Sequence, residues 1–311
     1  MADITASMVK ELRARTQAGM AACKDALVEA AADMEKAVEI ILKKGLVKAA
    51  DRAGRIAAEG EVATWVSPDG KKGVIVEVNC QTDFVARGDD FKNFVKNVAL
   101  VASTAPKGAD LGTLKYPGSG DTVEATRAAL VAKSGENTVI RRWGALEAKE
   151  PTGFVHTYVH NGKYAVLVHA EGPKSPDLTK FVDDVAMQVA SMSPWVVDKT
   201  EISPAQVAKQ KEIFAAQMKE EKEAGTLKAP EAAWPKIMDG KLAKWFTEVA
   251  LLEQDSVTDP AAGSIGKIRA ELSKKLGGEV KVHAFLRYGL GDGIEKKTED
   301  LAAEVAKTIG G

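Results

Sequence analysis

The sequence predicts an α+β protein with a duplicated core of small antiparallel sheets and packed helices. Three observations indicate this class. Apolar residues recur at helical spacing through the first fifty residues, a β-hairpin sequence occurs twice, and a long helical stretch interrupts the second copy. Helices and strands grouped in this way are typical of α+β folds, and 311 residues suffice for two or three domains.

Residues 1–54 are predicted to form a bundle of three short helices. Asp33 is the expected N-cap of the third helix, and Gly19 and Gly45 are expected helix breaks. In each helix the apolar residues fall on one face, at spacings of three and four. They are Met8, Val9 and Leu12; Cys23, Ala26, Leu27 and Ala30; and Met34, Ala37, Val38, Ile41 and Leu42.

The core is predicted to consist of two copies, residues 55–150 and residues 151–202 with 256–290. The hairpin sequence GEVATWVSPDGKKGVIVEVN from Gly60 is answered by GFVHTYVHNGKYAVLVHA from Gly153. Two helical patterns follow in each copy, FVKNVAL and RAALVAKSGE in the first, FVDDVAM and RAELSKKLGG in the second. Each copy then ends in a strand-like run, so hairpin, helix, helix and strand is the simplest interpretation.

The second copy contains an insertion of about 50 residues, placed at 203–255 and predicted to be a coiled-coil hairpin. Ser203 before Pro204 is typical of a helix start, and GTLKAP is the expected turn. Apolar residues of the second half step by four and three, as in a coiled-coil seam: Met238, Leu242, Trp245, Val249 and Leu252. Residues 291–311 are predicted to form a C-terminal module, a glycine-rich turn followed by a helix on Leu301, Val305 and Ile309.

The composition excludes several classes of protein. With 43 basic and 44 acidic residues the net charge is -1, which argues against a nucleic-acid binder, since such proteins carry a basic excess. Cys23 and Cys80 lie in no metal-ligand spacing, which favours a reducing compartment without a disulfide. The N-terminus resembles no signal peptide and no apolar run spans a membrane, so we expect a cytoplasmic protein.

Catalytic, cofactor and metal signatures are not found in the sequence. GSIGKI has Ile268 where a phosphate loop needs a hydroxyl, and GLGDG is not the dinucleotide-binding pattern. His156 and His160 lie four residues apart on a predicted strand, about 13 Å, too far to share one metal. The sequence therefore predicts a binding protein without cofactor or metal, and not an enzyme.

The stretch EVNCQTDFVAR, residues 77–87, places a phenylalanine just after a predicted strand. In one interpretation Thr82 or Asp83 caps a helix beginning near Phe84, and Phe84 and Val85 pack under the sheet. In the other, Phe84 is an exposed aromatic wedge for a partner, with an acidic neighbour that competes for hydrogen-bond donors. The residues alone do not choose between the two.

Two long motifs resemble the signatures of the bacterial translation elongation factor Ts family. LRARTQAGMAACKDAL, residues 12–27, is similar to the first signature, and EVNCQTDFVAR to the second. The hairpin repeat, the helical insertion and the tail LRYGLGDGIEK occur in the same order, so the likeness spans essentially the whole chain. One departure is a long inserted arm with an added Trp-Pro at Trp234.

The resemblance implies a guanine nucleotide exchange factor for elongation factor Tu, without covalent chemistry. It implies that the N-terminal bundle is ubiquitin-associated-like and contacts the partner through Arg13 and Met20. By the same likeness, Thr82, Asp83, Phe84 and Val85 dislodge Mg²⁺ from elongation factor Tu. The inserted arm is a candidate homodimer contact, and no direct contact with nucleic acid or membrane is expected.

Two other classes of function stay open on the sequence. A module that binds RNA or the ribosome directly predicts binding that weakens steeply with salt, which a gel shift measures. An enzyme predicts a metal or nucleotide that copurifies, which native mass spectrometry detects.

Overall fold

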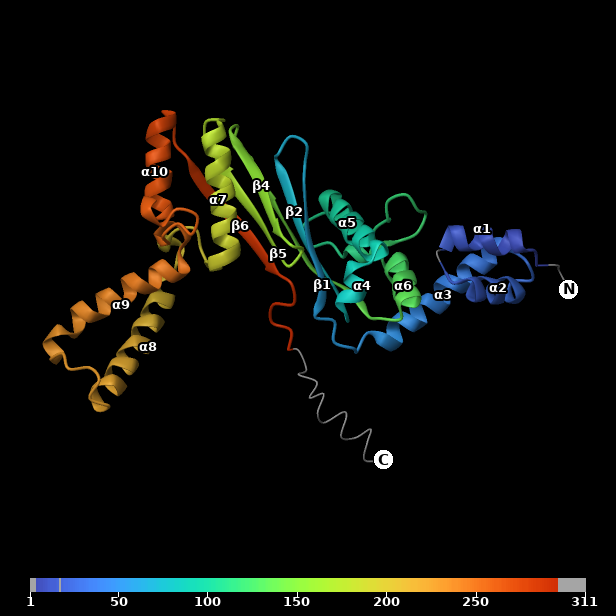
Figure 1. Ribbon diagram of the computed structural model, residues 1–311, viewed down its shortest axis with the longest axis horizontal. Helices are drawn as coiled ribbons and strands as arrows, with labels where there is room; N and C mark the ends of the chain where they lie inside the picture. The colour runs from blue at the N-terminus through green and yellow to red at the C-terminus, as the bar shows by residue number, and fades with distance from the viewer. Residues whose placement is uncertain (1–3, 17, 296–311) are drawn as a thin grey trace. The chain divides into compact units, whose positions relative to one another are not determined.

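The computed structural model describes residues 4–16 and 18–295. Within them the fold is α+β as predicted, with ten α-helices and two three-stranded sheets of order β1-β2-β3 and β4-β5-β6 (Figure 1). The helices are α1 (Ala6–Thr16), α2 (Met20–Glu29), α3 (Met34–Arg52), α4 (Asp83–Arg87), α5 (Asp89–Thr104), α6 (Val123–Ser134), α7 (Pro176–Met192), α8 (Pro204–Glu223), α9 (Trp234–Val249) and α10 (Ile265–Leu276). The strands are β1 (Glu59–Val66), β2 (Lys72–Cys80), β3 (Thr138–Glu147), β4 (Gly153–His160), β5 (Tyr164–Glu171) and β6 (Lys281–Gly289).

The chain divides into two compact units, each described here by itself. Of the described residues, unit 1 takes those up to 63, 76–143 and 288–295, and unit 2 takes 64–75 and 144–287. The finer division into five parts, predicted from the sequence, stays a prediction.

The N-terminal bundle forms as predicted, from α1, α2 and the first half of α3. Asp33 caps α3 by accepting a hydrogen bond from the Lys36 backbone N–H, and Gly19 is the N-cap residue of α2. The predicted apolar faces meet in one small core. Its buried residues are Val9, Leu12, Cys23, Ala26, Leu27, Ala30, Ala37 and Ile41.

The predicted helix break at Gly45 is wrong, because α3 continues through Gly45 to Arg52. Gly45 is buried, and a Cβ atom there would lie 3.6 Å from the carbonyl oxygen of Ala128 in α6. The second half of α3 packs on α6, where Ala49, Ala128 and Val131 form a buried cluster. This glycine therefore allows two helices to approach closely instead of ending one.

The first core copy has the predicted order of hairpin, helix, helix and strand, with the short helix α4 between β2 and α5. The FVKNVAL pattern lies in α5, where Phe94, Val95 and Val98 are buried. RAALVAKSGE lies in α6, which ends at Gly135 in the left-handed conformation, with φ of 79°. β3 follows directly, so the predicted succession of elements is confirmed.

The second copy repeats this order in β4, β5, α7, α10 and β6. β4 pairs antiparallel with β5, so that Val155 lies opposite His169 and Gly153 opposite Glu171. One face of the sheet packs on α7 and α10 through an aliphatic core that includes Val168, Val182 and Val185. The predicted duplication of the fold is therefore confirmed.

The insertion is a hairpin of two helices, α8 and α9 (Figure 1). Ser203 forms a capping box with Gln206, and Pro204 is the first helical residue, as predicted. Leu242, Trp245 and Val249 of the predicted seam are buried together. Leu252 is different, because α9 ends at Val249 and Leu252 lies in the core of the second copy. The predicted helix on Leu301, Val305 and Ile309 lies outside the described residues.

Candidate functional site

The residues TDFV form the start of α4, a helix of five residues directly after β2. Thr82 is its N-cap, since its side chain accepts a hydrogen bond from the Val85 backbone N–H at 3.4 Å. Gly88 ends α4, and its backbone N–H donates to the Val85 carbonyl oxygen at 3.0 Å. A helix this short has little stability of its own, so neighbouring groups must hold it in place.

Glu136, in the loop between α6 and β3, supplies that support. Its carboxylate accepts two hydrogen bonds from Thr82, from the backbone N–H at 3.0 Å and from the hydroxyl at 2.7 Å. Next to it, the Asn137 backbone N–H donates to the Gln81 side chain at 2.8 Å. Hydrogen bonds to a charged acceptor, such as the Glu136 carboxylate, are the stronger kind. Glu136 and Asn137 together therefore hold Thr82 and Gln81, the two residues just before α4.

Phe84 projects from this fixed base, with 83% of its surface exposed. Val85 is partly buried, and Asp83 forms an ion pair with Arg87 at 2.8 Å on the exposed helix surface. The first interpretation of the motif is thus right about the cap at Thr82 and wrong about Phe84, which does not pack under the sheet. An exposed ring on a fixed mount loses few rotamers on entering a partner's pocket.

Cys80, at the end of β2, is a buried structural group. Its thiol donates to the Thr82 carbonyl oxygen at 3.2 Å. Burial, followed by the charges of Glu136 and Glu59, raises the pKa of the Cys80 thiol to about 12. A thiol with that pKa is protonated at neutral pH and is no nucleophile.

The two bundle residues predicted to contact a partner are both exposed. Arg13 lies in α1, and Met20, the first residue of α2, has 51% of its surface exposed. Thr82 and the first three residues of α4 therefore lie together. Arg13 and Met20 belong to the N-terminal bundle, which is part of the same unit.

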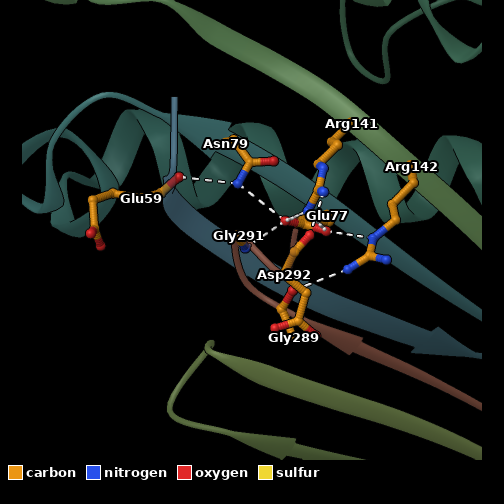
Figure 2. Close-up of polar contacts among 8 residues, drawn as sticks. All are labelled: Glu59, Glu77, Asn79, Arg141, Arg142, Gly289, Gly291 and Asp292. Atoms are coloured by element: carbon orange, nitrogen blue, oxygen red, sulfur yellow. Dashed lines mark hydrogen bonds and ion pairs between the residues drawn. The ribbon is translucent and has the colours of Figure 1, made fainter. Parts of the chain in front are cut away.

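A buried ionic cluster in unit 1 escaped the sequence analysis. Glu77 of β2 is fully buried and accepts hydrogen bonds from Arg141 at 2.9 Å and from Arg142 at 2.5 Å, both on β3 (Figure 2). The Gly291 backbone N–H donates to the same carboxylate at 2.8 Å. Burial works to raise the pKa of Glu77, but these donors outweigh it and hold the pKa below its ordinary value.

The same cluster explains the GLGDG sequence as a structural turn. Arg142 donates to the Gly289 carbonyl oxygen at 3.1 Å, and Arg141 donates to that of Asp292 (Figure 2). The turn is thereby held to β2 and β3 of the same unit. The sequence signals were one carboxylate inside the aliphatic run VIVEV and the adjacent arginines of TVIRRWG.

The histidines considered as metal ligands have other partners. His156 contacts the Asp183 carboxylate at 2.6 Å, and His160 contacts the Tyr158 hydroxyl at 3.0 Å. A different group, Glu150, His169 and His283, was not noticed in the sequence because its members lie far apart along the chain. Among the described residues, none of the helices has the length and apolar character needed to cross a bilayer.

Comparisons with known proteins place the sequence in a family. The family model described as "Elongation factor TS" matches residues 81–292, more than half of the chain. Elongation factor Ts of Clostridium kluyveri is 44% identical over 313 residues, covering 99% of each chain. The protein of that name from Bradyrhizobium sp. (strain ORS 278) is 42% identical, and that from Thioalkalivibrio sulfidiphilus 43%, over 100% and 97% of this chain. The chain belongs to the elongation factor Ts family of translation elongation factors.

Proposed function

We propose that this chain is a guanine nucleotide exchange factor for elongation factor Tu. In this proposal it binds the GDP form of Tu, disturbs the Mg²⁺ and phosphate site, promotes GDP release, and stabilises nucleotide-free Tu until GTP binds. The observation that supports it best is the 83% exposed ring of Phe84 on a helix fixed by the Glu136 carboxylate. Thr82, Asp83, Phe84 and Val85 form the element that dislodges Mg²⁺.

Exchange of this kind is a linkage effect and needs no covalent chemistry. A factor weakens GDP only if it binds nucleotide-free Tu more strongly than loaded Tu, and nucleotide must weaken the factor to the same extent. Moving a two-state balance from 1:99 to 99:1 takes about 5.5 kcal/mol. One inserted ring contributes about 2–4 kcal/mol, so further contacts must share the task. We assign part of that holding energy to Arg13 and Met20.

The decisive experiment is the rate of labelled GDP release from Tu with Phe84→Ala. Because the ring is exposed, we expect a normally folded chain that still binds Tu but accelerates release about 30-fold less or worse, the equivalent of about 2 kcal/mol. Leu100→Ala is the matched control, since it removes an exposed apolar side chain from α5 of the same unit. Equal release rates for the two variants would refute the role of Phe84.

The bundle contact is tested by Arg13→Ala combined with Met20→Ala. Deleting the whole bundle is a poor test, because α3 supplies Ala49 to a buried cluster with Ala128 and Val131 of α6. The double variant should bind Tu more weakly and leave the melting temperature unchanged. Unaltered affinity in a titration would remove Arg13 and Met20 from the interface.

Other properties of the protein stay predictions of this proposal. We expect a cytoplasmic factor that contacts no nucleic acid or membrane directly, which a gel shift at several salt concentrations checks. A homodimer through α8 and α9 predicts a sedimentation mass of about two chains for the parent and of one chain for a variant without the helical hairpin.

A further inference from the structure

The second core copy contains a cluster of two histidines and two carboxylates. His169 and Glu171 lie on β5, His283 on the neighbouring strand β6, and Glu150 in the loop before β4. The strands β4, β5 and β6 are labelled in Figure 1. One ligand atom from each of Glu150, His169 and His283 lies within 4.8 Å of the others. His169 Nε2 is 2.9 Å from the Glu150 carboxylate, and His283 Nε2 is 3.0 Å from that of Glu171.

The Glu150 carboxylate lies against the backbone of Gly153, where there is no side chain. A Cβ atom built on Gly153 would lie 2.7 Å from the Glu150 Oε2 atom, so the carboxylate occupies the space that any side chain at residue 153 would need. Lys71 fixes the same loop, because its ammonium donates to the carbonyl oxygens of Glu150 at 2.7 Å and Gly153 at 2.6 Å. The loop therefore presents its carboxylate to His169 in one orientation.

The donor side chains are also partly sheltered from solvent, as the ligands of a bound ion are. His169 has 8% of its surface exposed, Glu150 and Glu171 are partly buried, and His283 lies nearer the surface with 29% of its side chain exposed. The two imidazole rings stack with centroids 4.6 Å apart.

The donor types select the kind of ion. Two imidazoles with one or two carboxylates are typical ligands of Zn²⁺, whereas Mg²⁺ and Ca²⁺ prefer oxygen donors only. Tetrahedral Zn²⁺ places its ligand atoms about 3.3 Å apart, so small side-chain rotations from the present spacing suffice.

We propose that Glu150, His169 and His283 bind a Zn²⁺-class divalent cation, and that Glu171 holds the His283 ring or joins as the fourth ligand. The ion replaces the direct contact between His169 Nε2 and the Glu150 carboxylate. It links the loop before β4 to β5 and β6, which strengthens the sheet of the second core copy. This site is independent of the exchange function, and its test needs no assay of nucleotide release.

The test is a Zn²⁺ titration of the full chain, stripped with a chelator, in competition with a coloured zinc indicator. We expect one ion per chain, bound in the micromolar range or tighter, with a raised melting temperature and no comparable effect of Mg²⁺. His169→Gln removes one of the ligands, so the affinity for Zn²⁺ should fall at least about 100-fold. Losing only an outer hydrogen-bond partner of a ligand would have a smaller effect.

Two further variants separate a lost ligand from a damaged fold. Gly153→Ala keeps all ligands, but its added methyl group pushes the Glu150 carboxylate aside. The affinity for Zn²⁺ should therefore fall about tenfold. His156→Gln is the matched control, since His156 lies on β4 and also pairs with a carboxylate, that of Asp183, and it should bind Zn²⁺ like the parent. No binding by the parent chain, or equal binding by all three variants, overturns the site and leaves a hydrogen-bonded network.

Discussion

The two core copies share one order of elements and differ at the junction that follows the second strand. In the first copy β2 leads into α4, and the Glu136 carboxylate holds Thr82. In the second copy β5 leads to α7 without such a helix, and the residue matching Glu136 in the repeat is Gly278. A Cβ atom at Gly278 would lie 2.6 Å from Pro173, so close apolar packing takes the place of the ionic support.

This difference indicates what α4 contributes. None of its five residues is buried, and the second copy forms an equivalent core without such a helix. A segment without a fully buried apolar side chain contributes little to the fold through the hydrophobic effect. This difference supports the proposal that the fixed mount of Phe84 contacts a partner.

The copies also differ in the ionisable group buried on their second strand. In the first copy Glu77 meets two arginines of β3, and hydrogen bonds from its neighbours hold the pKa of its carboxyl below the ordinary value. In the second copy His169 meets His283 of β6 and the carboxylate of Glu150, the donor set of the proposed Zn²⁺ site. One cluster is an ionic link within the fold, and the other has the donor types of the proposed metal site.

The largest effect should come from Glu77→Ala, which breaks the ionic link of the first copy. The variant leaves Arg141 and Arg142 without their carboxylate and should lower the free energy of unfolding by about 2–4 kcal/mol, somewhat below the value for a fully buried pair because both arginines are partly exposed. Urea unfolding measures the difference. A change under 1 kcal/mol would show that the cluster is not a structural link.

The same variant has a defined pH dependence. Because the pKa of Glu77 is lowered in the folded chain, its contribution is complete above the ordinary pKa of about 4.5 and is lost as the pH falls through the lower folded value. The parent and Glu77→Ala should therefore differ fully at pH 7 and converge in strong acid. A difference that grows on acidification would contradict this sign.

A smaller effect is expected from Glu136→Ala, which removes the support that only the first copy has. Losing two hydrogen bonds to a partly buried carboxylate should cost about 1–3 kcal/mol of stability. GDP release from Tu should also be accelerated less, because Phe84 no longer has a fixed base. Full exchange activity at equal Tu binding would show that α4 needs no such mount.

The smallest effect tests what the copies have in common. Gly135 and Gly277 end α6 and α10 with φ of 79° and 65°, and an added Cβ atom would contact nothing within 4 Å at either site. Alanine should therefore cost only the backbone strain, about 1 kcal/mol in each variant. Thermal unfolding of Gly135→Ala and Gly277→Ala compares them. Costs differing by more than 1 kcal/mol would weaken the structural equivalence of the two copies.

Much of the fold could be predicted because its signals are local. Helical spacing predicted α1 to α3, the repeated hairpin predicted two sheets, and Ser203 before Pro204 predicted the start of α8. Gly45 was misread because the same residue ends helices and permits close helix packing, and only the neighbouring Ala128 distinguishes these roles.

By itself, the sequence determined the order of the elements, the duplication, the family, and the presence of a phenylalanine beside a helix cap. Tertiary structure alone decided that Phe84 is exposed, that Glu136 fixes its base, and which charged groups meet at Glu77 and at His169. The reason is physical. Periodicity and capping act over three or four residues, whereas exposure and ion pairing depend on groups that folding brings together from 19 to more than 100 residues away.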